Sequence, residues 1–170
     1  MLLIYGCDKG ISPEPENLGE GFSGTISFIG AWPDSITDTR LVVFDSLLIE
    51  QNDFNVFNLR YLSLTIPNNI QSFNFTSMDD SSLVPIKSGD YEYAAVIQSK
   101  KSSPGLDRSD WFVSGIYYAN GDTTKPGELI IPKNSFVKDI NIICDFNNPP
   151  PQPPSAIRNE NLPNGRQVKN

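Results

Sequence analysis

The sequence predicts an all-β fold, organised as a two-sheet antiparallel sandwich of about seven to eight strands. Three observations support this prediction. Short apolar segments with period-two alternation recur between residues 21 and 147. Clusters of glycine, proline, asparagine and aspartate separate these segments, as expected of turns. No segment has the apolar spacing of an amphipathic helix, and the 170-residue chain is long enough for one domain with its own core.

Each expected strand has its own signal. In residues 25–29, Ile26 and Phe28 alternate with polar residues and share the face toward the core. Residues 40–44 are apolar on both faces, which is typical of a central strand. The segment 61–66 alternates and stops at Pro67, which cannot donate to a sheet ladder. The other strands are expected at 70–76, with Phe73 and Phe75 inward, and at 90–97, 111–118, 128–131 and 138–146.

Two connecting segments are less regular. Residues 45–58 fit a strand extension, one helical turn or a long loop, and the sequence does not choose among them. The dipeptide Asn120-Gly121 is typical of a tight hairpin turn between Tyr118 and the next strand.

The two ends of the chain differ in composition from the expected domain at 21–147. Residues 8–20 hold two prolines, two glycines and four acids, which is typical of a flexible spacer. Residues 148–170 begin with two proline runs, which favour polyproline II, and continue without periodicity. We expect residues 1–20 to be an anchor remnant with its spacer, and residues 148–170 to be a disordered, proline-rich polar tail.

Cys7 follows the apolar run at residues 2–5 and Gly6, a pattern that resembles the lipobox of bacterial lipoproteins. In that family the chain is cut before the cysteine, which then carries acyl chains. The resemblance implies lipidation of Cys7 and a location in the bacterial cell envelope, at the outer membrane or the cell surface, on the extracytoplasmic side. The alternative is an apolar N-terminus with an ordinary cysteine, since residues 1–6 lack the basic start and longer apolar region of a signal peptide.

The charge balance narrows the range of partners. The chain has 13 basic and 20 acidic residues, for a formal net charge of −7. Such a surface repels phosphate backbones, so we expect no nucleic-acid partner. It also disfavours adsorption to anionic headgroups, so membrane attachment would depend on the lipid at Cys7.

The absence of histidine removes the commonest catalytic and metal-binding groups. There is no Ser-His-Asp triad, no Cys-His pair and no imidazole ligand. Cys144 shares a strand face with Ile140, Ile142 and Phe146, so we expect a small buried hydrophobic residue, or else a disulfide to Cys7. The sequence therefore predicts no enzyme and no cofactor.

Loop carboxylates remain as candidates for chemistry. Asp107, Asp110 and Asp122 flank one expected strand and are weak calcium candidates, because calcium needs only oxygen ligands. The same residues, with Asp79 and Asp80, are candidates for the carboxylate pair of a small hydrolase. The simpler interpretation is that these aspartates cap backbone amides in turns.

Aromatic residues are the best candidates for a binding function. Trp32 lies in a loop with glycine and proline, and Tyr117 and Tyr118 are consecutive, so one of them should face outward. Tyr91 and Tyr93 should share one strand face. We regard Trp32, Tyr117 and Tyr118 as candidate contacts for a protein or glycan partner. The alternative is that Trp32 caps one end of the sandwich and the tyrosines line its core.

Three motifs carry a resemblance to a known family. Residues 21–28, Gly-Phe-Ser-Gly-Thr-Ile-Ser-Phe, resemble the opening strand of transthyretin-like domains, including carboxypeptidase regulatory-like modules. Residues 87–96 are similar to their Pro-Gly-x-Tyr turn and strand, and residues 109–117 look like a segment of envelope lipoproteins with such a domain. The resemblance covers roughly residues 21–147, without a match at 45–80. It implies a prealbumin-like sandwich with a scaffold or contact role. An immunoglobulin-like order is the alternative, because local strand patterns do not fix topology.

These observations predict a non-catalytic, lipid-anchored cell-envelope protein with a structural or protein-contact role. One alternative is a carbohydrate- or calcium-dependent surface-binding module. A second alternative is a small hydrolase that uses carboxylates.

Overall fold

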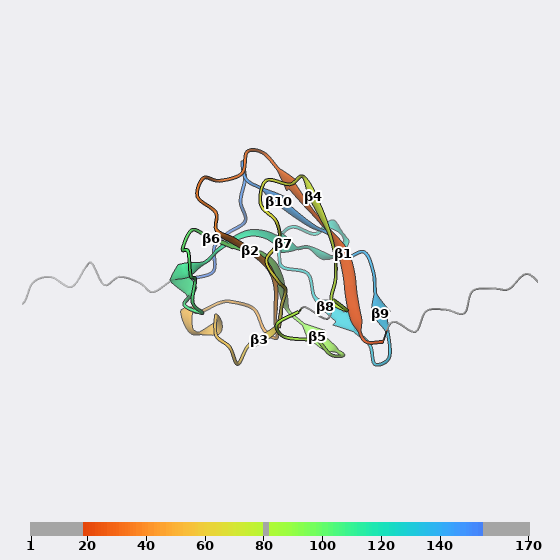
Figure 1. The fold of residues 1–170 in the computed structure, drawn as a ribbon. Helices are drawn as coiled ribbons and strands as arrows, with labels where there is room; N and C mark the ends of the chain where they lie inside the picture. Colours follow the sequence, from red (N-terminus) through yellow and green to blue (C-terminus); the bar gives the residue numbers. More distant parts are fainter. Residues whose placement is uncertain (1–18, 80–81, 155–170) are drawn as a thin grey trace, which may run out of the picture.

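The structure is a computed structural model that describes residues 19–79 and 82–154 (Figure 1). In these residues the chain is all-β with almost no helix, which confirms the predicted fold class. The helical pieces are three 3-10 turns: η1 Gln51–Asp53, η2 Arg108–Asp110 and η3 Ala119–Gly121. The strands are β1 Gly21–Ile29, β2 Asp38–Phe44, β3 Leu59–Leu62, β4 Ser72–Thr76, β5 Gly89–Tyr91, β6 Tyr93–Ser99, β7 Phe112–Tyr117, β8 Leu129–Ile131, β9 Phe136–Val137 and β10 Ile142–Asp145.

Eight strands form one mixed sheet in the order β3-β2-β6-β7-β10-β1-β4, with β9 beside β1, while β5 and β8 form a separate small sheet. Most neighbours are antiparallel, but β1 runs parallel to both β10 and β9. The expectation of a wholly antiparallel sandwich is therefore wrong. Side-chain alternation indicates which face of a strand is buried, and it does not indicate the direction of the neighbouring strand.

The large sheet is curled, so that strands from its two halves share one interior (Figure 1). Phe22 of β1 packs edge-on against Tyr61 of β3 and Phe75 of β4, with ring centroids 5.3 and 5.6 Å apart. We call this interior the inner cluster. Its fully buried members include Phe22, Ile26, Leu41, Val43, Tyr61, Ile66, Val96, Leu129, Ile131, Ile142 and Cys144.

A second apolar cluster lies on the opposite face of β2, β6 and β7, and we call it the outer cluster. Along β2, Leu41 and Val43 belong to the inner cluster, whereas Val42 and Phe44 belong to the outer one. Irregular segments at 45–58 and 100–111 contribute to this second cluster, and no second layer formed by the described strands covers it. Its buried members are Val42, Phe44, Leu48, Leu59, Tyr93, Ala95, Ile97, Trp111, Val113 and Ile116.

The strand expected at 90–97 is broken at Glu92 into β5 and β6, which belong to different sheets. Tyr91 consequently joins the inner cluster and Tyr93 the outer one, so the expectation that they share a face is wrong. The physical reason is that Glu92 is an extra residue between the two strands and pairs in neither sheet. It shifts the alternation by one, so that the side chains after it point to the opposite face. Residues 45–58 form a long loop that contains η1.

The hairpin expected at Asn120-Gly121 is also wrong. Both residues have the positive φ of a tight turn, 55° and 75°. However, β7 pairs with β6 and β10, whereas β8 pairs with β5. The turn therefore joins two strands of different sheets.

The immunoglobulin-like alternative does not fit the strand order. In that fold the second and third strands belong to different sheets. Here β2 and β3 are hydrogen-bonded neighbours, with Val42 opposite Leu62 and Val43 opposite Tyr61.

The folded part begins and ends beyond the expected bounds of 21–147. At its start, the Glu20 carboxylate accepts hydrogen bonds from the backbone N–H groups of Ser88, at 2.9 Å, and Asn134, at 3.0 Å. Residues 1–18, including Cys7, lie outside the described residues, as do 155–170. Among the described residues, none forms a helix long and apolar enough to cross a membrane.

The expectation of a disordered tail is wrong for residues 148–154, which pack against the domain. Gln152 accepts from the backbone N–H of Val113 at 2.8 Å and donates to its carbonyl at 2.7 Å. Arg108 donates to the carbonyl of Pro153 at 2.9 Å. The Gln152 side chain thus supplies both hydrogen bonds that a strand would give Val113, beyond the end of β10. We call residues 148–154 the C-terminal strap.

Candidate functional site: an apolar groove on the outer face

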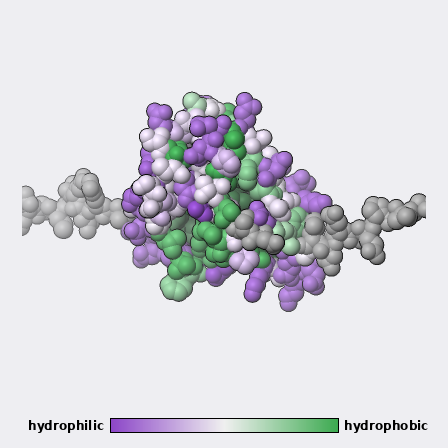
Figure 2. Space-filling model, viewed as in Figure 1, coloured by the Kyte–Doolittle hydropathy of each residue, from purple (hydrophilic) through white to green (hydrophobic). Residues whose placement is uncertain are grey.

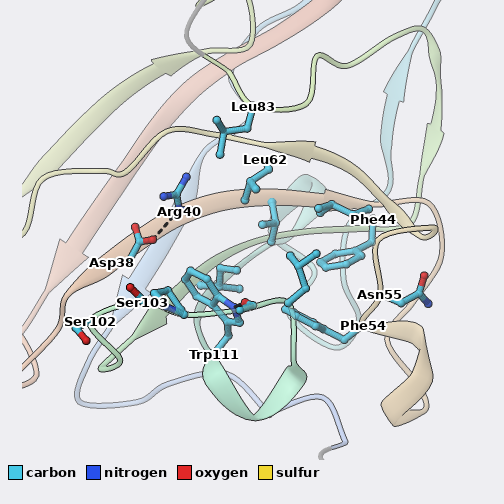
Figure 3. Close-up of a pocket in the computed structure, with 16 residues that line it drawn as sticks. Asp38, Arg40, Phe44, Phe54, Asn55, Leu62, Leu83, Ser102, Ser103 and Trp111 are labelled. Carbon is cyan, nitrogen blue, oxygen red and sulfur yellow. Dashed lines mark hydrogen bonds and ion pairs between the residues drawn. The ribbon is translucent and has the colours of Figure 1, made fainter.

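A groove of about 460 Å³ opens on the outer face of the sheet, over β2, β3 and β6 (Figure 3). We call it the outer groove. Its volume lies within the range of ligand-binding clefts, roughly 300–1,000 Å³. It is lined by Asp38, Arg40, Val42, Phe44, Phe54, Asn55, Leu59, Leu62, Leu83, Ile97, Ser102, Ser103, Pro104, Gly105, Leu106 and Trp111.

The floor of the outer groove is part of the outer cluster. Val42 and Phe44 of β2 and Ile97 of β6 are almost fully buried there, next to Trp111. These residues point outward because they alternate with the residues that fill the inner cluster. An apolar floor on this face follows directly from a strand that is apolar on both sides.

One wall is the loop that precedes β7. The Trp111 indole N–H donates to the Gly105 carbonyl at 2.7 Å, and the Gly105 N–H donates to the Asp110 carboxylate at 2.8 Å. Lys101 also donates to Asp110 as an ion pair. Two hydrogen bonds hold the pKa of Asp110 below its ordinary value. The one from Lys101 has the larger effect, and the one from the Gly105 N–H has the smaller. The wall is therefore fixed by one buried carboxylate.

The opposite wall comes from the 45–58 loop. Asp53 accepts from the backbone N–H groups of Ile49 and Glu50, at 2.8 and 2.6 Å, which closes the turn at η1. This turn places Phe54 against Phe44, with ring centroids 5.3 Å apart. Both walls are therefore made by loops and held by local hydrogen bonds.

The charged pair in the lining, Asp38 and Arg40, has its hydrogen-bond partners within the protein. Arg40 Nε lies 2.8 Å from the Asp38 carboxylate, and its other nitrogens donate to the Ser63 carbonyl and the Thr65 hydroxyl at 3.0 and 3.1 Å. Asp38 and Arg40 are the charged members of the lining among residues 19–79 and 82–154, and their two charges cancel. The arrangement favours an apolar, uncharged occupant.

The rim is apolar and open to solvent. Leu83 is 56% exposed and Leu106 is 54% exposed, and Leu62 in the same lining is half-buried. Figure 3 shows Leu62 and Leu83 on the side opposite Trp111. The 45–58 loop, whose Phe54 and Asn55 line the groove, also carries exposed apolar side chains at Ile49, Val56 and Phe57. Figure 2 shows apolar side chains gathered over the lower part of this view, where β3 and this loop lie in Figure 1.

The structure places the predicted aromatic candidates away from this groove. Trp32 packs between Phe28 and Phe146, with ring centroids 4.6 and 5.1 Å away, and its indole N–H donates to the Ile70 carbonyl at 2.9 Å. Trp32 therefore closes one end of the inner cluster. Tyr117 and Tyr118 are both half-buried and pack against the inner and the outer cluster respectively, so neither is fully outward.

The calcium candidates are not brought together. Asp110 lies before β7 and is bound by Lys101, whereas Asp122 lies after β7 and accepts from the Thr124 N–H and hydroxyl. Those Thr124 hydrogen bonds hold the pKa of Asp122 below its ordinary value. Asp107 precedes η2 and is exposed. Within 19–79 and 82–154, no group of three or more Cys, Asp or Glu side chains is arranged to hold a metal ion.

Cys144 is a buried member of the inner cluster with a free thiol, as the sequence predicted for a small hydrophobic residue. Burial raises the pKa of this thiol to about 12, with a weaker opposing effect from the Ser114 hydroxyl, 3.7 Å from the sulfur. The thiolate needed of a nucleophile is therefore strongly disfavoured. Cys7, the predicted lipidation site, lies outside the described residues.

Comparison of the chain with protein-family models, curated proteins and solved structures found no match.

Proposed function

We propose that this protein is a non-catalytic contact protein of the bacterial cell envelope, and that its outer groove receives apolar side chains from a protein partner. Acyl chains on Cys7 would hold it to a membrane, and stable anchoring needs more than one chain. The observation that carries the proposal is the outer groove, with its apolar floor, its self-paired charges and its exposed leucine rim.

A protein surface suits this groove better than a small molecule. Small-molecule sites bury most of the ligand within the pocket. Here Leu83 and Leu106 stand at the rim in contact with water, and the exposed Val56 and Phe57 directly follow the lining residues Phe54 and Asn55 in the chain. Only an occupant larger than the groove covers all of these side chains at once. Exposed apolar patches of this kind mark interaction sites in soluble domains.

The finer fold assignment, a transthyretin-like sandwich, is part of this proposal. The strand order supports it, because β3, β2, β6 and β7 form one antiparallel group and β10, β1 and β4 follow as a second group. The two groups face each other across the inner cluster. A scaffold of this kind leaves its outer surface free for contacts.

The groove is tested with a displayed library of random peptides selected against the full chain. We expect enrichment of peptides with two or more bulky apolar side chains. The double variant Leu83→Asp/Leu106→Asp should weaken their binding at least tenfold, because burial of one large side chain is worth roughly 1.5–3 kcal/mol and about 1.4 kcal/mol is tenfold. The matched control is Ile130→Asp on β8, where an equally exposed apolar residue lies outside the groove. Equal loss in both variants, or no enrichment, would overturn the groove assignment.

The anchor is tested separately. A bacterium that acylates lipoproteins would express the chain behind a full lipoprotein signal peptide, in medium with a fatty-acid analogue. We expect label on the wild-type protein and none on Cys7→Ser. Equal labelling of the two proteins, or none on either, would remove the lipid anchor without affecting the groove.

A further inference from the structure

The second surface of interest is the free edge of β4. This strand, Ser72–Thr76, stands at one end of the sheet order and pairs with β1 on its other side. We infer that this edge pairs with β4 of a second copy of the chain, so that one sheet continues across two subunits. The inference is independent of the outer groove, which lies at the other end of the sheet.

The register shows which backbone groups point outward. Phe28 N–H donates to the Gln71 carbonyl and Ser77 N–H to the Phe22 carbonyl, so these pairs are the hydrogen-bonded ones. In an antiparallel ladder the alternate residues direct their N–H and C=O groups away from the partner. On β4 those residues are Ser72, Asn74 and Thr76, and all three are exposed. Among the described residues, no backbone hydrogen bond reaches the N–H of Ser72 or Asn74.

In the part of the chain that the structure describes, this edge lacks the usual protection against strand pairing. Natural edges are blocked by lysine, proline, a bulge or a covering segment. Residues 70–78 contain no charged residue and no proline, although the whole chain carries a net charge of −7. The pairing of β4 with β1 continues without a register shift. This uncharged stretch can therefore approach a copy of itself without placing like charges opposite each other.

The opposite end of the same sheet shows what a protected edge looks like in this protein. The Leu83 N–H donates to the Leu62 carbonyl of β3 at 3.1 Å, and Leu62 forms a bridge with Val84. Both paired segments are followed by a proline: Pro67 comes after the β3 segment, and Pro85 comes directly after Val84. The β3 edge is thus covered within the subunit, whereas β4 has no equivalent among the described residues.

A second copy fits this edge because the pairing closes on itself. A two-fold axis at Asn74 places Asn74 opposite its own copy and Ser72 opposite Thr76, with N–H groups facing carbonyls. The Thr76 carbonyl also accepts the Asp79 N–H within the subunit, at 3.4 Å, so it would accept two hydrogen bonds in this pairing. In such an isologous contact the β4 edge of each subunit is paired with that of the other, so no free β4 edge remains and assembly stops at a dimer. If the chain is tethered to a membrane, as proposed above, the raised local concentration would favour the same contact.

The test is a charge-swap experiment at the proposed axis, read by analytical ultracentrifugation of the full chain. Asn74→Lys and Asn74→Asp each place like charges opposite each other, so each should weaken dimerisation at least tenfold. A one-to-one mixture of the two should regain it, because lysine then faces aspartate. The matched controls are Asn52→Lys and Asn52→Asp, which make the same charge changes on an exposed residue of η1.

Three outcomes would overturn the inference. One is a wild-type chain that stays monomeric up to a concentration of about 0.5 mM, roughly 4–5 kcal/mol of affinity. Another is dimerisation that survives both single substitutions or is not regained in the mixture. The third is assembly beyond a dimer. Because Asn74 accepts a hydrogen bond from the Thr25 hydroxyl, Ser72→Lys serves as a second variant if Asn74→Lys lowers the melting temperature.

Discussion

The inner and outer clusters share the strands β2 and β6 but are enclosed in different ways. The inner cluster is closed by strands from both halves of the curled sheet, and its aromatic rings meet edge-on across the interior. The outer cluster is closed by the 45–58 loop, the loop before β7 and the C-terminal strap. The difference shows that strands with two apolar faces need a cover on both sides, and that a cover made of loops leaves a groove.

The same difference separates stability from function in this molecule. Side chains in the inner cluster have fixed partners on all sides, so substitutions there should act on folding. Side chains around the outer groove have water on one side, and Leu83 and Leu106 give up little packing if replaced. Substitutions at the rim should therefore act on binding.

The largest effect is expected from Phe22→Ala, which removes a ring buried against Tyr61 and Phe75. We expect a loss of about 3–5 kcal/mol in the free energy of unfolding, measured by urea denaturation. The companion variant is Phe54→Ala in the outer loop, where the ring is half-buried. It should cost clearly less. Equal losses for the two rings would mean that the clusters are enclosed equally well.

The next effect is expected from Gly115→Ala on β7. A methyl group there would stand 2.6 Å from the Cys144 sulfur and 2.8 Å from the Ile143 carbonyl, so β10 would have to shift. Overpacking of this kind costs about 1–3 kcal/mol. The control is Gly121→Ala, where nothing lies within 4 Å but φ is +75°, so its cost comes from the backbone alone. Removing the sulfur with Cys144→Ala should recover part of the loss at Gly115 and none at Gly121.

The sequence predicted the strands much better than it predicted their neighbours. The alternation of Ile26 and Phe28, of Phe73 and Phe75, and of Ile142 and Cys144 indicated the faces that the structure buries wholly or in part. Those patterns are local, and each one indicates only which face of its own strand is buried. The parallel pairing of β1 with β10 involves residues more than a hundred positions apart, and no local pattern encodes it.

The groove was missed for a related reason, although a signal was present. Residues 40–44 are apolar on both faces, which indicated a central strand but not what covers its outer face. The sequence does not assign a structure to residues 45–58, and the proline-rich, polar and non-periodic composition of 148–170 predicts a disordered tail. What fixes the strap is Gln152, whose side chain bonds to Val113. A contact between an irregular segment and a distant strand leaves no periodic pattern in the sequence.

A smaller effect is expected from Gln152→Ala in the strap. The substitution leaves the Val113 N–H and carbonyl without partners, so we expect a loss of about 1–2 kcal/mol in the free energy of unfolding. Amide hydrogen exchange should also accelerate at Val113, while exchange in β2 should follow only the global change. The control is Gln51→Ala, an exposed glutamine in η1. Unchanged exchange at Val113 would show that the strap does not hold this edge.

The smallest effect concerns the wall of the outer groove and its dependence on pH. Lys101 and the Gly105 N–H stabilise the charged form of Asp110 and lower its pKa in the folded protein. A carboxyl group with a folded pKa below its unfolded pKa stabilises the fold at pH values above the ordinary aspartate range. That contribution is lost as the pH falls through the lowered folded pKa. Acid should therefore loosen the loop at 101–106 before the inner cluster responds.

Trp111 reports this change directly, because its indole N–H bonds to Gly105 in the same loop. In a Trp32→Phe background, the emission of Trp111 should shift toward longer wavelengths below the ordinary pH range of aspartate. Asp110→Asn should abolish the dependence on pH, because an amide does not titrate there. Asp122→Asn is the matched control, since the pKa of Asp122 is also lowered but by Thr124, beyond the other end of β7. A transition that persists in Asp110→Asn, or disappears in Asp122→Asn, would assign acid sensitivity to a group outside the groove wall.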